Sequence, residues 1–263
     1  MTMDRHGRSD RPSPLLLLAL AGAVGLALAS VAAPDPVPPV AACPEGGCES
    51  AVDEPRAMRL MADDACRDAG YLCARLSSDA GFRVQRWAES RRALRVRVES
   101  LDHEEPQAAA ALRSAATRGI NAWQGRPFPL SIDDRGASPD PEADIVIRWT
   151  RQLDGVALGT TRTRWESGPA GATFTAVEVD LATRNPYNAQ FRMTPEDIEL
   201  VAAHEMGHAL GLPHSDHLAD LMYPTNSAAR LSARDYRTMS ALYRLPNGAH
   251  VVSREGVAAG GRP

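Results

Sequence analysis

Three histidines stand at fixed spacing near residue 210, in the pattern H-E-x-x-H-x-x-G-x-x-H over residues 204–214. An i,i+4 pair places His204 and His208 on one face of a helix, so both imidazoles can bind one ion. Glycine at 211 allows the chain to reverse, and this reversal brings His214 round as a third nitrogen ligand. Three imidazoles with an open fourth position are typical of a catalytic zinc site, whereas structural zinc sites have four protein ligands.

Glu205 is the acidic residue of this pattern. It is rotated about 100° from His204 around the helix, so it lies beside the metal rather than on it. Zinc lowers the pKa of a bound water toward ~7, and the carboxylate can take the proton of that water. Glu205 can then pass the proton to the departing amine. The pattern therefore predicts hydrolysis of a peptide or similar amide bond.

The histidine pattern lies in a segment with clear helix signals. Thr194 can be the N-cap, Pro195 occupies the first helical position, and Asp197 stands where a capping box has its acidic residue. These signals and Gly211 predict a helix over residues 194–210. A final helix is expected from Ser232, with Asp235 again at the third position.

The remaining elements follow from hydrophobic periodicity. Helices are expected over residues 54–78 and 106–123. Alternating apolar residues predict strands near residues 94–98, 130–132, 143–149, 160–165 and 173–181.

The N-terminus has the features of an export signal. Arg5, Arg8 and Arg11 precede an apolar run over residues 15–33. Three outcomes are open: cleavage near residues 30–32, a retained membrane anchor, or lipoprotein processing before Cys43. All three place the rest of the chain outside the cytoplasm, as a secreted, periplasmic or cell-surface protein.

The four cysteines lie close together in the sequence. In an exported chain their even number favours disulfides, and we expect Cys43 to pair with Cys48 and Cys66 with Cys73. A zinc knuckle is the alternative, but the offsets of the two pairs do not fit the common spacings.

Composition excludes several functional classes. The 29 basic residues are all arginine, which excludes phosphate-loop NTPases and Schiff-base enzymes. The net charge is −4 and the arginines are scattered along the chain, so we expect no nucleic-acid partner. The expected partner is a protein or peptide substrate, and the oligomeric state stays open.

Shortly after the third histidine, residues 220–224 read Asp-Leu-Met-Tyr-Pro. With this turn and residues 204–215, the chain resembles the matrixins, the matrix-metalloprotease-like branch of the metzincin zinc endopeptidases. The resemblance covers about residues 90–246. It implies that Met222 supports the three histidines as an apolar floor, and that the fold is an α+β zincin-like catalytic domain. Such a domain has a five-stranded mixed sheet, with one antiparallel strand, and three helices.

The composition of the segments, together with the resemblance, suggests how the chain is organised. We expect a signal peptide or anchor over residues 1–33, and a Pro-rich linker with a Cys-containing extension over residues 34–85. The catalytic domain would occupy residues 86–246, and a flexible tail residues 247–263. The substrate would pair with an edge strand, for which residues 173–180 are the candidate.

The sequence also departs from the family pattern. No histidine occurs between Glu104 and Ala203, so the second, structural zinc of the vertebrate members is not expected. None of the cysteines stands in the motif by which a pro-segment thiolate caps the zinc, and Asn226 stands where a pocket tyrosine is frequent. Calcium is an open question, because the sequence has no acidic loop of calcium-binding spacing.

Other candidate residues near the histidines are less informative. His217 is expected to be an exposed loop residue, because three ligands and a water already complete a zinc shell. Asp235 can either brace the methionine turn or cap its own helix.

Two other functions compete with a zinc endopeptidase. One is a matrixin-like module that binds zinc and partners without cutting, which the intact Glu205 argues against. The other is a zinc amidase or exopeptidase acting on cell-wall peptides.

Overall fold

The structure is a computed structural model that describes residues 58–74, 76, 81–135, 142–168, 171–225 and 228–253. In chain order its elements are β1 (Arg59–Met61), α1 (Ala62–Ala65), β2 (Phe82–Arg83), β3 (Gln85–Arg86), β4 (Leu94–Val98), α2 (Pro106–Asn121), β5 (Leu130–Asp133), β6 (Ile145–Thr150), β7 (Gly159–Gly168), β8 (Gly171–Ala182), α3 (Pro195–Ala209), α4 (Ala233–Arg244) and β9 (His250–Val252).

The main sheet has the strand order β3-β8-β6-β4-β5. β3 and β6 pair with different stretches of one side of β8, and β7 pairs with its other side. All its pairings are parallel except that of β7 with β8. In β4 the side chains of Leu94, Val96 and Val98 are buried, whereas Arg95 and Arg97 are partly exposed. This alternation has the period of two that the sequence predicted.

The fold class expected from the sequence is confirmed, with a small difference in the number of elements. The five long strands include the one antiparallel strand, and α2, α3 and α4 are the three expected helices. The two-residue β3 adds a sixth strand to the sheet. So short a strand carries no periodic pattern that the sequence could reveal.

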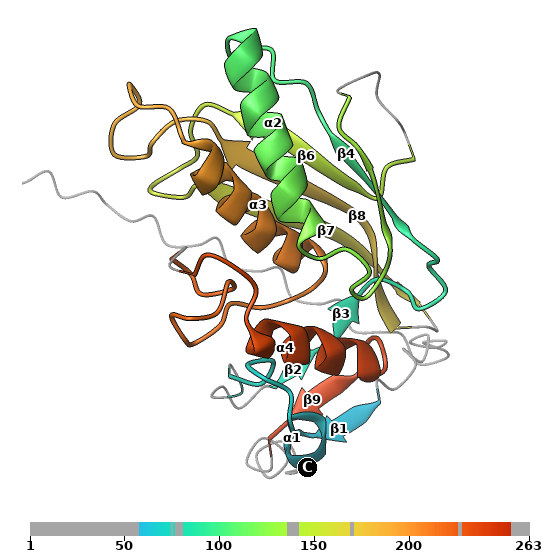
Figure 1. Ribbon diagram of the computed structural model, residues 1–263. Helices are drawn as coiled ribbons and strands as arrows, with labels where there is room; N and C mark the ends of the chain where they lie inside the picture. The colour runs from blue at the N-terminus through green and yellow to red at the C-terminus, as the bar shows by residue number, and fades with distance from the viewer. Residues whose placement is uncertain are drawn as a thin grey trace, which may run out of the picture. The chain divides into compact units, whose positions relative to one another are not determined.

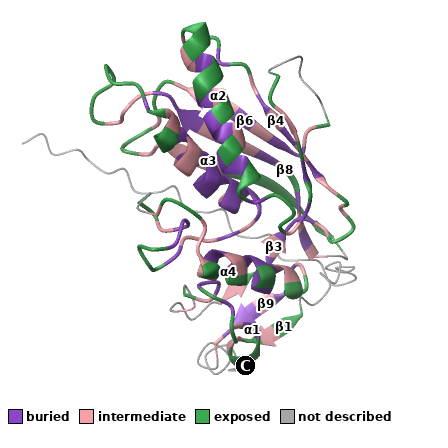
Figure 2. Ribbon diagram, viewed as in Figure 1, coloured by how far each residue is buried: buried purple, intermediate pink, exposed green. Residues whose placement is uncertain are grey.

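Helices α2 and α3 pack against each other on one face of the main sheet (Figure 1). The faces that they turn inward are buried (Figure 2), and include Leu112, Ile120 and Ile198. A Cβ atom on Gly119 of α2 would lie 2.2 Å from the backbone oxygen of Glu199, so glycine is what allows this close approach. The packing places α3, with the histidine pattern, beside α2 and against β7 and β8.

A second, three-stranded sheet joins the two ends of the described chain. Its order is β1-β9-β2, with β9 parallel to β1 and antiparallel to β2. The expectation of a flexible tail over residues 247–263 is therefore wrong for its first part, because Val251 is fully buried within this sheet. Residues 254–263 lie outside the described residues.

The helix predicted over residues 54–78 is also wrong for most of its described part. Residues 59–61 form β1 and only residues 62–65 are helical. The apolar spacing that suggested a longer helix serves instead to pack Ala65, at the end of the short α1, and Ala69 and Leu72, in the turn-rich loop after it, into the core.

The candidate for the substrate-binding edge, residues 173–180, was wrong as well. These residues belong to β8, which is paired on both sides: with β7 on one and with β3 and β6 on the other. The edge of the sheet beside β8 is β7, whose residues 164–168 are all exposed. β7 is polar, with Trp165 as its one large apolar side chain, whereas β8 carries buried apolar residues such as Phe174 and Val179, so the more polar strand is the edge strand.

The expected disulfide between Cys66 and Cys73 is present. Its predicted partner disulfide, Cys43 with Cys48, and the predicted signal over residues 1–33 lie outside the described residues. Among the helices that the structure describes, none combines the length and the apolar character needed to cross a bilayer.

Candidate functional site

Helix α3 positions two of the three predicted metal ligands, and its start is fixed as the sequence predicted. The Thr194 hydroxyl accepts a hydrogen bond from the Asp197 backbone N–H at 3.1 Å. The Asp197 carboxylate in turn accepts one from the Thr194 backbone N–H at 3.2 Å. The helix ends at Ala209, and Gly211 takes a left-handed φ of 100°, which reverses the chain toward His214.

The three predicted ligands meet at one point. One ring nitrogen from each of His204, His208 and His214 lies within 4.8 Å of the other two. The Nε2 atoms of His204 and His208 are only 3.2 Å apart. Because neutral imidazoles that share one ion have to converge in this way, the donor set fits a metal such as zinc.

Backbone carbonyls fix the orientation of two of these rings. The Nδ1 of His204 donates to the Leu221 carbonyl at 2.8 Å, and that of His208 to the Leu212 carbonyl at 2.8 Å. A carbonyl can only accept, so Nδ1 carries the proton and Nε2 is left with a lone pair for a metal. Burial lowers the pKa of His204, which favours the neutral form that a ligand needs.

Glu205 lies beside the histidines and is only 6% exposed. The hydroxyl of Thr161 on β7 donates to its carboxylate at 2.6 Å, and lies 3.1 Å from its backbone oxygen. Burial raises the pKa of Glu205 to about 7, and the hydrogen bond from Thr161 opposes this shift. A carboxyl group with a pKa near neutrality is suited to both taking up and releasing a proton.

β7 comes unusually close to this carboxylate. A Cβ atom on Gly159 would lie 2.6 Å from Cγ and 2.7 Å from Oε1 of Glu205. The edge strand and α3 therefore touch at the catalytic candidate, and only a residue without a side chain fits at position 159.

Glu205, His208 and His214 open onto a cleft of about 690 Å³. β7 forms one wall through Gly159, Thr160, Thr161 and Thr163. Other parts of the wall are formed by the ligand loop over residues 211–213 and by residues 82–85 of the N-terminal segment. The cleft is large enough for several residues of an extended peptide.

Met222 is fully buried and packs against the histidine helix. A Cβ atom on Gly207 would lie 2.3 Å from its sulfur, so the thioether fills the space that this glycine leaves. The turn around Met222 is braced by Asp235 of α4, whose carboxylate accepts from the Leu221 N–H at 3.0 Å. Asp235 also accepts from the Ser232 N–H at 2.7 Å, so the two roles considered for it hold together.

Sequence reasoning did not find every residue of this site. It missed Thr161 and Gly159, because both are more than 40 residues before Glu205 in the sequence and nothing local marks which strand faces α3. It also left Asp235 outside the site, although a role in bracing the methionine turn was considered for it. His217 is exposed and lies outside the histidine triad, as expected.

Comparison with known proteins agrees with this geometry. Residues 86–244 match the matrixin family, which is more than half of the chain. The chain belongs to the matrixin family. It is also 46% identical over 52 residues to the macrophage metalloelastase of Rattus norvegicus. That segment covers 18% of this chain and 11% of the metalloelastase, so the chain spans only a small part of that relative's length. Matrixins are zinc-dependent, and membership of this family supports a zinc metalloprotease function.

Proposed function

We propose that this matrixin is an exported zinc endopeptidase that cuts extended segments of protein substrates. The observation that carries the proposal is the convergence of three imidazoles beside a buried carboxylate on the wall of an open cleft. The basic and apolar segments before residue 34 support export.

In this proposal His204, His208 and His214 hold the zinc. When bound, zinc would supply a Lewis acid for the scissile carbonyl and for the attacking water. Glu205 takes a proton from the water at its carboxylate and delivers it to the departing amine nitrogen. Thr161 keeps that carboxylate turned toward the cleft through its 2.6 Å hydrogen bond.

Edge strand β7 is where the peptide would bind. One side of β7 pairs with β8, and its other side can accept an extended segment by main-chain hydrogen bonds. Because Gly159 and Thr161 lie on the same strand, a peptide that pairs there is held next to Glu205.

The test is cleavage of an unfolded protein such as casein by the zinc-loaded full chain, with Glu205→Gln as the control. Mass spectrometry of the fragments should show internal cuts that are absent from the control and that a chelator abolishes. Trimming from peptide ends alone would point to an exopeptidase. No cleavage of casein, with hydrolysis of amide bonds in cell-wall peptides to free amines and carboxylates, would point to an amidase, and no cleavage of either to a binding module.

A further inference from the structure

We infer that the disulfide-closed loop Cys66–Cys73 positions the metal centre, with Tyr71 as the residue through which it acts. The loop lies before residue 86, where the match to the matrixin family begins, so the family pattern does not account for it. The inference rests on the proposed function, because it assigns this loop a role at the same histidines.

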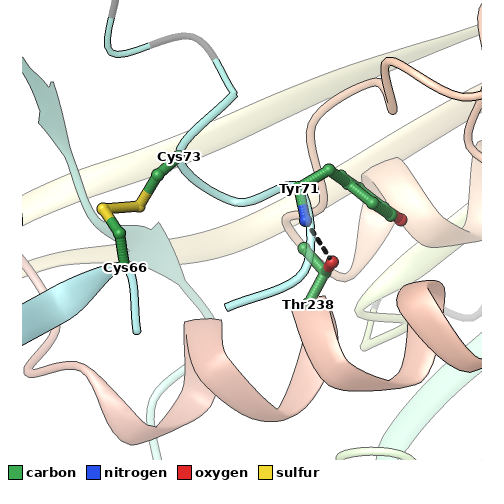
Figure 3. Close-up of a disulfide and its surroundings, with 4 residues drawn as sticks. All are labelled: Cys66, Tyr71, Cys73 and Thr238. Carbon is green, nitrogen blue, oxygen red and sulfur yellow. Dashed lines mark hydrogen bonds between the residues drawn. A yellow bond between two sulfur atoms is a disulfide. The ribbon is translucent and has the colours of Figure 1, made fainter. Parts of the chain in front are cut away.

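Tyr71 ties the loop to helix α4 at two points. Its backbone N–H donates to the Thr238 hydroxyl at 3.1 Å (Figure 3). Its own hydroxyl donates to the Asp235 carboxylate at 2.7 Å. The approach is close, since a Cβ atom on the preceding Gly70 would lie 2.2 Å from the Thr238 oxygen. Tyr71 is only 1% exposed, so water does not compete for these contacts.

Asp235 transmits this contact toward the histidines. It is fully buried, and besides Tyr71 its carboxylate accepts from the backbone N–H groups of Leu221 and Ser232. The carbonyl of the same Leu221 accepts the Nδ1 proton of His204. Three hydrogen bonds in sequence therefore connect the Tyr71 hydroxyl to the ring of His204: Tyr71 to Asp235, Leu221 to Asp235, and His204 to Leu221.

The charges around Tyr71 favour this direction of donation. Burial first, and then the neighbouring Asp235 carboxylate, hold the pKa of Tyr71 well above its usual range, so its hydroxyl keeps its proton. The guanidinium of Arg234 lies 5.6 Å from the centre of the Tyr71 ring and pairs with Asp220 at 2.9 Å. A buried carboxylate needs all its donors, and removal of the Tyr71 hydroxyl leaves Oδ1 of Asp235, among the described residues, with only the distant Met222 N–H at 3.5 Å, so the carboxylate that braces Leu221 is held less firmly.

The disulfide holds the loop in the conformation that presents Tyr71. It joins two cysteines seven residues apart, and Tyr71 lies two residues before the second of them. Apart from α1, the described residues between β1 and β2 consist of turns and irregular backbone. Without the crosslink this segment gains conformational freedom, and the Tyr71 contact becomes harder to maintain.

The experiment measures how fast the zinc-loaded full chain loses its metal to an excess of a chromogenic chelator. Tyr71→Phe removes only the hydroxyl, and Cys66→Ser with Cys73→Ser removes the crosslink. Ser240→Ala is the matched control, because it also loses a hydroxyl bond on α4, the 2.9 Å bond of the exposed Ser240 to the Tyr236 carbonyl. Thermal unfolding of the zinc-free proteins separates a general loss of stability from loosening of the metal.

We expect zinc release about 5-fold faster in Tyr71→Phe, because changes in groups that orient a metal-bound histidine typically weaken binding by about 10-fold or more and Tyr71 acts one step further out. The double cysteine variant should release zinc at least as fast, and Ser240→Ala at the native rate. A Tyr71→Phe chain that keeps its zinc as long as the native chain would overturn the inference while leaving the proposed function intact. A native chain that takes up no zinc would overturn both.

Discussion

At the metal side of the site two ligand histidines are held by backbone carbonyls, whereas at the carboxylate side Glu205 is held by a side-chain hydroxyl. The partners of His204 and His208 are the carbonyls of Leu221 and Leu212. The partner of Glu205 is the hydroxyl of Thr161 on the edge strand. A carbonyl stays in place whichever side chain its residue carries, whereas a threonine hydroxyl is lost in one substitution. The metal side should therefore resist single changes in its surroundings better than the carboxylate side.

The largest effect is expected when the charge of Glu205 itself is removed, and this change shows whether the carboxylate side can fail while the metal side stays intact. Glu205→Gln keeps the shape of the side chain but can no longer take up a proton, so kcat/KM should fall by about 10³-fold. Zinc content should stay at the native value, because Glu205 is not among the three converging ligands. Metal analysis and a cleavage assay on the same preparation check both halves, and loss of zinc would mean that the two sides are not separate.

A smaller effect should follow from filling the contact between β7 and α3. In Gly159→Ala the new methyl group would lie 2.6 Å from Cγ of Glu205, so the carboxylate or the strand has to move. A displacement of about 1 Å at a catalytic group can lower the rate about 10²-fold, so we expect kcat/KM of Gly159→Ala to fall by about this factor in a cleavage assay.

The control for this change is Gly168→Ala at the other end of the same strand, where an added Cβ meets nothing within 4 Å. If the two glycine variants cleave at equal rates, β7 does not constrain Glu205.

The smallest effect is expected for the hydroxyl that orients the carboxylate. Thr161→Val should lower kcat by about 10-fold, because the carboxylate loses its aligning hydrogen bond. The same bond lowers the pKa of Glu205 against the effect of burial, so its loss should raise that pKa further above its ordinary value. Glu205 then stays protonated up to a higher pH, so the acidic limb of the kcat/KM profile moves to higher pH.

The pH dependence of cleavage by three variants distinguishes lost orientation from a changed cleft wall. Thr161→Ser keeps the hydroxyl, so its rate and its acidic limb should both stay at the native values. Thr163→Val, which alters the same wall of the cleft without a contact to Glu205, should leave the limb where it is. An acidic limb that moves equally in Thr161→Val and Thr163→Val would contradict the assigned hydrogen bond.

The same contrast explains how much of the molecule the sequence could predict. Helix α3 was found with its cap, its end and its two histidines, because capping residues, glycine and i,i+4 spacing all act over a few residues. The disulfide between Cys66 and Cys73 was found for the same reason, since its ends are near in sequence. The apolar alternation of β4 and β6 was likewise sufficient to identify the strands themselves.

What the sequence could not predict depends on contacts between distant segments. The edge position of β7, and with it the roles of Gly159 and Thr161, follows from the pairing order of the sheet. β9 was missed because a three-residue strand has no pattern of its own and forms only between β1 and β2. Tyr71 reaches Asp235 across 164 residues of sequence, a contact that no local signal reveals.

The most direct test of this account is the zinc content per chain of the native protein, Glu205→Gln and His214→Ala, each dialysed against trace zinc and analysed by mass spectrometry of the metal. The account predicts about one zinc in the first two and far less in the third, because only the histidines hold the ion. A native chain without zinc, or a His214→Ala chain with as much zinc as the native one, would contradict it.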